Sequence, residues 1–291
     1  MLNPNSPQSI GPYQQHVPGD HSTMEYGAYY EKSVLLPFDQ DNKRTIRVWL
    51  PEGYGENDHR YPVIYFSDGQ NLVDNELSAY GDWGLDKVMH RLQSEGYPPA
   101  ILVGIDCPKE VYKRTNELNP PYMTKLVVAR HNKPFHPRAN IYIEYIIQEI
   151  KPEIDRYFLT LGDLRHTGIG GSSMGGIMAF YAYMHYPETF GFSLSFSIPV
   201  FFYSYAKWKQ MLEEWDFKAQ NNRKLAIYVG GEGFEARFNK GTKWLIQYLR
   251  DNGYDESCLH YQEDASQPHH EAAWHTYSYE ALKFFLKDLK D

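Results

Sequence analysis

Ser173 stands at the centre of Gly171-Ser172-Ser173-Met174-Gly175, a pentapeptide of the form Gly-x-Ser-x-Gly. Residues 166–170 before it have the pattern of a short buried strand, and residues 176–185 after it have the pattern of a helix. A strand that turns sharply into a helix strains the residue at the turn, so small neighbours are needed on both sides. Such a turn exposes the serine hydroxyl in front of a helix N-terminus. The pattern therefore predicts that Ser173 is a nucleophile.

A serine hydroxyl needs a base within hydrogen-bond reach, and the base needs a group that orients it. The segment Asp264 to His270 follows the last expected strand and opens the last expected helix. In an α/β-hydrolase the base lies in that position, so we expect it to be His269 or His270. A metal cluster that joins these histidines to His275 would lack a recognisable ligand spacing, and the sequence predicts no metal and no cofactor.

The orienting acid should follow the strand expected at Lys224 to Val229, because the order along such chains is serine, acid, histidine. Two glycines stand directly after that strand and let the chain turn a carboxylate inward. We expect Glu232 to be the acid, with Glu235 as the second choice.

An oxyanion hole needs two backbone N–H groups that point at the developing negative charge. The first expected donor is the N–H of Met174, beside the nucleophile. The second should come from the turn Asp68-Gly69-Gln70-Asn71, which follows a strand at Pro62 to Phe66. We expect the Gln70 N–H to be that donor, although Asp-Gly is also ordinary turn chemistry.

Strand-like and helix-like segments alternate after an antiparallel hairpin formed by residues 29–37 and 44–50. This alternation predicts an α/β protein with a mostly parallel central sheet and helices on both faces, the α/β-hydrolase fold. We expect residues 1–24 to be a loose arm and residues 25–291 to form one domain. Further strands are expected at 100–105, 192–196 and 258–262, and further helices at 82–95, 141–158 (kinked near Pro152), 205–215, 241–252 and 271–289.

The connection at residues 107–140 is too long for an ordinary loop and falls at the carboxyl edge of the expected sheet, so we expect it to cover the site. It carries seven Lys or Arg residues against two Glu, in a chain of net charge −8. This local excess indicates either attraction of an anionic substrate, with Arg114 and Arg130 as contacts, or a solvated basic face. The seven are Lys109, Lys113, Arg114, Lys125, Arg130, Lys133 and Arg138.

Aromatic residues make up 16% of the chain. Phe201, Phe202 and Tyr203 follow the strand expected at 192–196, where they could stack on an aromatic or sugar group or pack in the core.

The net negative charge of the chain argues against general nucleic-acid binding. Neither a membrane span nor a secretion signal is expected, and two cysteines, Cys107 and Cys258, fit a reducing cytoplasm.

Three stretches resemble the Putative esterase family of α/β-hydrolases, which includes esterase D, ferric-siderophore esterases, and feruloyl and acetyl-xylan esterases. They are residues 61–71 (YPVIYFSDGQN), 170–176 (GGSSMGG) and 269–274 (HHEAAW), and the resemblance runs from about residue 30 to the C-terminus. The resemblance implies that the first histidine of the last stretch, His269, is the base, and that Glu271 to Trp274 are mainly the packed start of a helix. Where family members often have a Gly-Thr-x-Glu/Asp turn, this chain has Gly-Gly-Glu-Gly at 230–233.

Together these features predict a cofactor-independent serine esterase that acts on a small-molecule ester, of an aromatic or anionic acid or an acylated sugar, through an acyl-enzyme. Two alternatives stay open. An acyltransferase would use the same triad with a hydroxyl in place of water. A binding protein of the hydrolase type would hold its ligand without catalysis.

Overall fold

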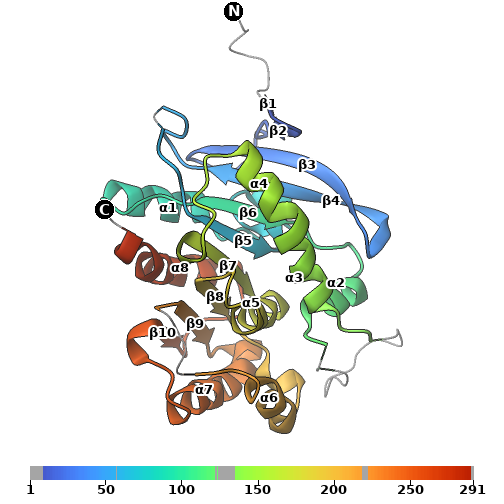
Figure 1. Cartoon of the computed structure of the whole chain (residues 1–291), viewed down its shortest axis with the longest axis vertical. Coiled ribbons are helices and arrows are strands. Elements are labelled where there is room, and N and C mark those ends of the chain that lie inside the picture. The colour runs from blue at the N-terminus through green and yellow to red at the C-terminus, as the bar shows by residue number, and fades with distance from the viewer. Residues whose placement is uncertain (1–8, 57, 122, 124–134, 218–221, 290–291) are drawn as a thin grey trace, which may run out of the picture.

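A ten-stranded sheet runs through the molecule (Figure 1). The computed structural model describes residues 9–56, 58–121, 123, 135–217 and 222–289. The strand order is β1-β2-β3-β4-β6-β5-β7-β8-β9-β10. Pairing is antiparallel from β1 to β4 and between β4 and β6, and parallel from β6 to β10. The strands are β1 Ser9–Ile10, β2 Tyr13–Gln15, β3 Ala28–Leu36, β4 Asp39–Leu50, β5 Val63–Ser67, β6 Ile101–Ile105, β7 Thr167–Ser172, β8 Phe192–Phe196, β9 Lys224–Gly230 and β10 Leu259–Asp264.

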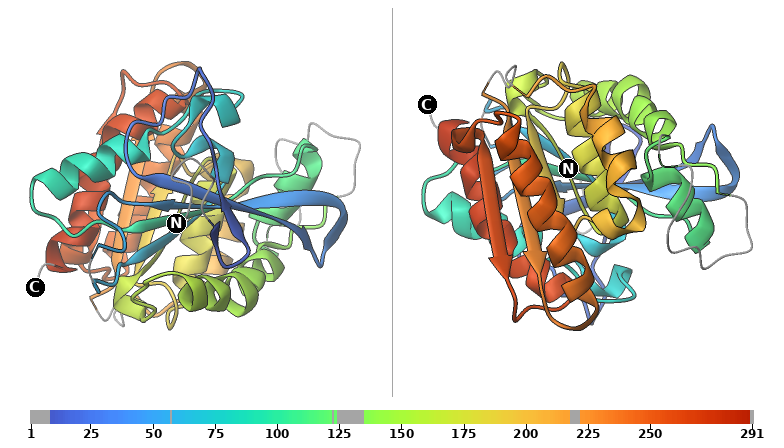
Figure 2. Two further views of the ribbon diagram at one scale, coloured as in Figure 1. Left: turned by 90° about the horizontal axis from the view of Figure 1, so that it is seen from above. Right: turned by 90° about the horizontal axis from the view of Figure 1, so that it is seen from below.

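Helices cover both faces of this sheet, as the two end-on views show (Figure 2). One face packs against α1 and α8, and residues of these two helices share one apolar core. The other face packs against α3 to α7 in a second core. The α-helices are α1 Leu85–Ser94, α2 Val111–Leu118, α3 Ala139–Tyr145, α4 Lys151–Tyr157, α5 Met174–His185, α6 Tyr205–Leu212, α7 Ala236–Asp251 and α8 Glu271–Leu286.

Three of the parallel strands are buried along their whole length. Every residue of β5 (VIYFS), β6 (ILVGI) and β8 (FSLSF) is buried. A strand with helices on both faces has no solvated side, so all of its side chains, including the serines of β8, are covered by protein. The predicted fold, a mostly parallel sheet with helices on both faces and an antiparallel N-terminal hairpin, is confirmed.

Two expected elements differ in detail from the structure. The hairpin turns at residues 37–38 instead of 39–42, because β4 already begins at Asp39. The helix expected at 141–158 is α3 and α4 joined by a π-helical turn, Ile146–Ile150. The irregularity directly precedes Pro152, whose ring excludes a normal helical hydrogen bond.

The described part of the N-terminal arm, residues 9–24, is bound to the domain and is not loose. It contributes β1 and β2 to the sheet. Beyond β2 the chain crosses the loop that follows β5, where Ser22 Oγ donates to Asp74 at 2.6 Å and Thr23 Oγ1 donates to Asp82 at 2.6 Å. The arm was expected to be loose because its polar composition does not reveal these partners, which lie more than 50 residues away.

Candidate active site

The loops after β5, β7, β8, β9 and β10 meet at one edge of the sheet, because these strands are parallel. Four non-glycine residues in the described part of the chain have positive φ. Three of them, Asp68, Ser173 and Ser197, directly follow a strand at this edge. Positive φ is strained for residues other than glycine and gathers at functional sites.

Ser173 forms the turn between β7 and α5, with φ 56° and ψ −121°. The glycines around it are required by close approach of other atoms. A Cβ on Gly171 would lie 2.7 Å from the carbonyl of Gly175, and one on Gly176 would lie 2.4 Å from the Phe196 oxygen. The Ser173 N–H donates to the Phe196 carbonyl at 3.0 Å, which fixes the turn against the end of β8. This is the geometry that the glycine pentad predicts for a nucleophile elbow.

His269 is held by a buried carboxylate. Its Nδ1 is hydrogen-bonded to Oε2 of Glu235, a residue with no exposed surface. The other oxygen of that carboxylate, Oε1, accepts from the Gly230 N–H at 3.1 Å. Both carboxylate oxygens therefore have hydrogen-bond partners, and the carboxylate engages Nδ1, not Nε2, of the imidazole.

The first choice for the acid, Glu232, is corrected by this geometry. Glu232 is exposed and lies at the start of the short 3-10 helix Gly233–Glu235. The Gly231 and Glu232 N–H groups both donate to the Gln267 carbonyl at 3.0 Å, which binds this turn to the loop that carries His269 through its backbone. The 3-10 turn then carries Glu235, three residues further, to the imidazole.

Aromatic rings enclose the His269 imidazole on three sides. Phe238 stacks on it, with ring centroids 4.5 Å apart. Trp274 meets it edge-on at 5.0 Å and Phe234 edge-on at 5.7 Å. The rings fix the plane of the imidazole and exclude water from the Glu235 side.

Ser173 and His269 are connected through β8 and α8. Ser173 is bound to the end of β8 at Phe196, and the next residue, Ser197, accepts from Trp274 Nε1 at 2.9 Å. Trp274 in turn contacts the imidazole of His269. The structure therefore brings the predicted nucleophile and the predicted base to the same edge of the sheet.

Both expected oxyanion donors lie at this edge. Met174 is the first residue of α5, and a first-turn N–H has no acceptor within its own helix. Gln70 lies in the 3-10 helix Gly69–Asn71 after β5. The two segments are adjacent, since a Cβ on Gly175 would lie 2.3 Å from Ser67 Oγ. The Gln70 side chain is fixed on Cys107, whose N–H donates to Gln70 Oε1 at 3.1 Å.

Three of the four described cations in the segment 107–140 are engaged by the protein itself, and the fourth, Lys109, is exposed. Arg114 Nε and Nη2 donate to the two oxygens of Asp68 at 2.6 and 2.7 Å. Lys113 Nζ lies 2.7 Å from Asp39 Oδ1, and Arg138 Nη1 donates to a backbone carbonyl at 3.2 Å. The helix α2 that carries the first two was not predicted. Lys125, Arg130 and Lys133 lie outside the described residues.

The three aromatic residues expected either to stack on substrate or to pack in the core, Phe201 to Tyr203, lie in different surroundings. Tyr203 is buried and its hydroxyl donates to Asn119 Oδ1, so it belongs to the core. Phe202 is half-buried and packs against the same core. Phe201 contacts Phe234 and Phe238, and through them reaches the base. Phe234 is 51% exposed, and sequence analysis missed it because its role depends on the turn that delivers Glu235.

Glu271 is a second buried carboxyl at this edge, one that sequence analysis assigned to helix packing. It is 6% exposed and begins α8, two residues after His269. Burial raises its pKa to about 7, and the Asp68 carboxylate acts in the same direction, whereas His269 and Arg114 act against it. Asn71 Nδ2 approaches Glu271 Oε1 at 3.4 Å.

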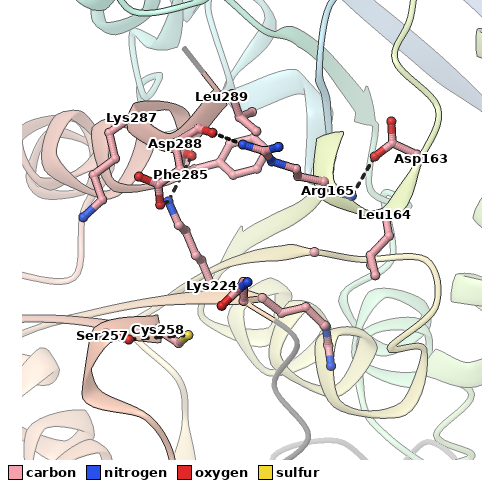
Figure 3. Close-up of a pocket in the computed structure, with 13 residues that line it drawn as sticks. Asp163, Leu164, Arg165, Lys224, Ser257, Cys258, Phe285, Lys287, Asp288 and Leu289 are labelled. Carbon is pink, nitrogen blue, oxygen red and sulfur yellow. Dashed lines mark hydrogen bonds and ion pairs between the residues drawn. The ribbon is translucent and has the colours of Figure 1, made fainter. Parts of the chain in front are cut away.

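The opposite edge of the sheet holds a cavity of about 790 Å³ (Figure 3). Two of its cations bind the end of the chain's last helical segment, since Lys224 Nζ donates to the Phe284 carbonyl at 2.6 Å and Arg165 donates to the Asp288 carbonyl. The residues that line the cavity include no histidine, so it brings together no set like Ser173, Glu235 and His269 at the other edge. Within the described residues, no three His, Cys, Asp or Glu side chains are grouped as metal ligands. Across the same residues, no helix has the length and apolar character that crossing a bilayer requires.

The sequence is similar to a protein-family model and to proteins of known sequence. The model of the Putative esterase family matches residues 40–287. A protein of Bacillus subtilis (strain 168), the uncharacterized protein YbbA, is 24% identical over 233 residues, which are 78% of this chain and 86% of that protein. An endo-1,4-beta-xylanase/feruloyl esterase of Xylanibacter ruminicola is 25% identical over 193 residues, which are 65% of this chain but 23% of that protein.

The fold is shared with solved structures as well. An IroE-like serine hydrolase from Shewanella oneidensis superimposes with a TM-score of 0.71 at 21% identity, over 89% of this chain and 80% of the other. Since the family model matches residues 40–287, the resemblance seen in three short stretches extends over most of the chain, from β4 to α8. The chain belongs to the Putative esterase family.

Proposed function

We propose that this protein is a serine esterase that hydrolyses small carboxylic esters through a covalent acyl-enzyme. Membership of an esterase family supports ester hydrolysis. The observation that carries the serine mechanism is the pairing of a strained Ser173 turn with a buried Glu235–His269 hydrogen bond at one edge of the sheet. Nucleophile, acid and base follow one another along the chain as Ser173, Glu235 and His269, the order usual for an α/β-hydrolase.

In the first half-reaction Ser173 Oγ attacks the ester carbonyl carbon while His269 Nε2 takes the hydroxyl proton. Glu235 holds the imidazole by Nδ1 and stabilises its positive charge. The Met174 and Gln70 N–H groups stabilise the oxyanion. The bond from the carbonyl carbon to the leaving oxygen then breaks, and His269 gives its proton to the alcohol.

In the second half-reaction water replaces the alcohol. His269 Nε2 takes a proton from the water, whose oxygen attacks the acyl carbon. Collapse of the second tetrahedral intermediate returns the proton to Ser173 Oγ and releases the acid. The enclosure of the base by Phe238, Trp274 and Phe234 favours this chemistry, since charges interact more strongly where water is excluded.

For the substrate, we propose an ester with an aromatic acyl or alcohol group. Phe201 and Phe234 form an aromatic surface beside His269, and the Arg237 guanidinium lies over Phe201 at 4.8 Å and over Phe234 at 5.8 Å. Among the described residues no carboxylate forms an ion pair with Arg237, so this cation is available to an anionic ring substituent. One relative carries the name feruloyl esterase, which agrees with an aromatic substrate.

The test is hydrolysis of a panel of p-nitrophenyl esters and feruloylated or acetylated sugars, with product analysis. Ser173→Ala and His269→Ala should lose activity by about 10⁴-fold in kcat, whereas Ser172→Ala and His270→Ala should keep most of it. Transfer of the acyl group to an added sugar instead of water would identify an acyltransferase. Absence of hydrolysis by the wild-type protein throughout the panel would favour the binding-protein alternative.

A further inference from the structure

Glu271 is a buried titratable group for which the mechanism above has no use. It begins α8 and lies between the loop that carries His269 and the loop that carries Gln70. A carboxyl at 6% exposure is rare unless it has partners, because burial disfavours its charged form. We therefore expect specific contacts to hold the Glu271 carboxyl in this buried position.

Asn71 connects Glu271 to the loop after β5. Its Nδ2 approaches Glu271 Oε1 at 3.4 Å, and its Oδ1 accepts from Ser78 Oγ at 3.0 Å. The Asn71 N–H donates to the Asp68 carbonyl at 2.9 Å, and the Asn71 carbonyl accepts from the Trp83 N–H at 2.8 Å. Every polar group of Asn71 is thus engaged, and its side chain is the direct polar contact from the Gln70 loop to α8.

A second contact makes the same connection one helical turn further. His275 Nδ1 lies 2.7 Å from the Trp83 carbonyl, which is an acceptor, so this nitrogen carries the proton. Gly81 also passes against the start of α8, since a Cβ there would lie 3.9 Å from Glu271 Cβ. The first two turns of α8 are thereby packed against residues 71–84.

Glu271 also acts on the base through its charge. The groups with which it interacts come from three places: His269 on the base-bearing loop, Asp68 after β5 and Arg114 on α2. On its own helix His275 follows one turn later, where its Nδ1 is hydrogen-bonded to the Trp83 carbonyl. An ionised Glu271 favours the imidazolium form of His269, which is the form that the base adopts when it has taken the serine proton.

We propose that Glu271 is a positioning residue that, through Asn71, fixes the oxyanion loop relative to His269 and stabilises the imidazolium formed during catalysis. This inference rests on the esterase function proposed above. It assigns no contact between Glu271 and the substrate. It explains why a carboxyl occupies the first buried position of α8, where an apolar residue would pack without a charge to desolvate.

Three variants test the proposal on a neutral p-nitrophenyl ester. Glu271→Ala and Asn71→Ala each remove the side-chain link, so each should lower kcat about 10-fold with KM within about 2-fold. The double variant should lose little more than either single one, because both remove the same link. Glu271→Gln keeps an oxygen for Asn71 and should keep kcat within about 3-fold at pH 8.

The pH profile separates positioning of the base from simple packing. Glu271→Gln removes a negative charge near His269, so the acid limb of kcat/KM should move to lower pH by about 0.5 unit. Glu280→Gln, an exposed charge change on the same helix, should leave both kcat and the limb unchanged. The proposal would be overturned if Glu271→Ala and Asn71→Ala had the same kcat as the wild-type protein. It would also be overturned if the acid limb of the kcat/KM profile of Glu271→Gln coincided with that of the wild-type protein.

A readout without turnover keeps this inference distinct from the proposed function. Hydrogen exchange at residues 69–71 should be faster in Glu271→Ala than in the wild-type protein and in Glu280→Gln. If the wild-type protein hydrolyses no ester, the proposed function fails, and the exchange measurement still decides whether Glu271 holds the loop. Unchanged exchange at residues 69–71 would refute the link.

Discussion

Arg114 and Asp68 are joined by two parallel hydrogen bonds, from Nε at 2.6 Å and from Nη2 at 2.7 Å. Asp68 has left-handed backbone angles, φ 56° and ψ 46°, two residues before Gln70. A bidentate pair of this kind fixes orientation as well as distance. Arg114 therefore holds the loop that carries the expected oxyanion donor, and most of its charge is used within the protein.

Arg114→Gln should consequently lower kcat about 10- to 100-fold for neutral and anionic esters alike, because it frees the loop in both cases. Lys109→Gln, which removes an exposed cation from the same segment, should leave the neutral ester unaffected. Steady-state kinetics at about 0.01 and 0.15 M salt measures both effects. A loss confined to the anionic ester, and shrinking as salt rises, would instead restore the hypothesis that Arg114 attracts substrate.

Glu235→Gln should lower kcat by about 10² to 10⁴-fold, because an amide cannot stabilise the imidazolium and can select the wrong tautomer. Glu232→Gln is the matched control three residues away. It changes an exposed side chain whose contribution to the turn is its backbone N–H, so its kcat should stay within about 2-fold of wild type. Comparable losses in both variants would mean that the turn as a whole, and not the Glu235 carboxylate, supports His269.

The raised pKa of Glu271 predicts that the folded protein becomes less stable as the pH rises. The native protein releases this proton near pH 7, whereas the unfolded chain releases it near 4.5. The Glu271 carboxyl therefore makes its full contribution to the stability of the folded protein below pH 4.5. This contribution to the free energy of unfolding, on the order of 3 kcal/mol, is lost as the pH rises to about 7.

Glu271→Gln stays neutral at every pH, so its Tm should rise relative to wild type between pH 5 and pH 8. Thermal unfolding followed by circular dichroism at the two pH values measures the difference, with Glu280→Gln as control. A Tm difference between Glu271→Gln and wild type that does not change with pH would show that Glu271 keeps an ordinary pKa.

Phe234→Ala should raise KM for aryl esters by roughly 2- to 10-fold and leave an acetyl ester of an aliphatic alcohol unchanged, since one aromatic contact is removed. Tyr205→Ala is the control, because Tyr205 is also partly exposed but pairs with Trp244 on α7. Equal effects of the two substitutions on both esters would assign Phe234 to packing.

The sequence predicted those features of the site that depend on local pattern. The glycines around Ser173 are dictated by the turn itself, so the strained elbow could be placed to the residue. Glu235 ranked second because the 3-10 turn that delivers it is three residues long and carries no distinct pattern. The pairing of Arg114 with Asp68 joins segments 46 residues apart, and a count of charges cannot tell such a cation from a free one.

The anchoring of the N-terminal arm has a consequence for how the chain folds during synthesis. The Glu25 N–H donates to Asp86 Oδ2 at 2.8 Å, and Ser22 and Thr23 donate to Asp74, although 51 to 61 residues separate the partners. Both aspartates have no exposed surface. Residues 22–25 are synthesised before these partners and must therefore wait until α1 has been made before they can dock. A truncation that begins after residue 26 would leave both carboxylates buried with fewer donors and would weaken the loop that leads back to Asn71.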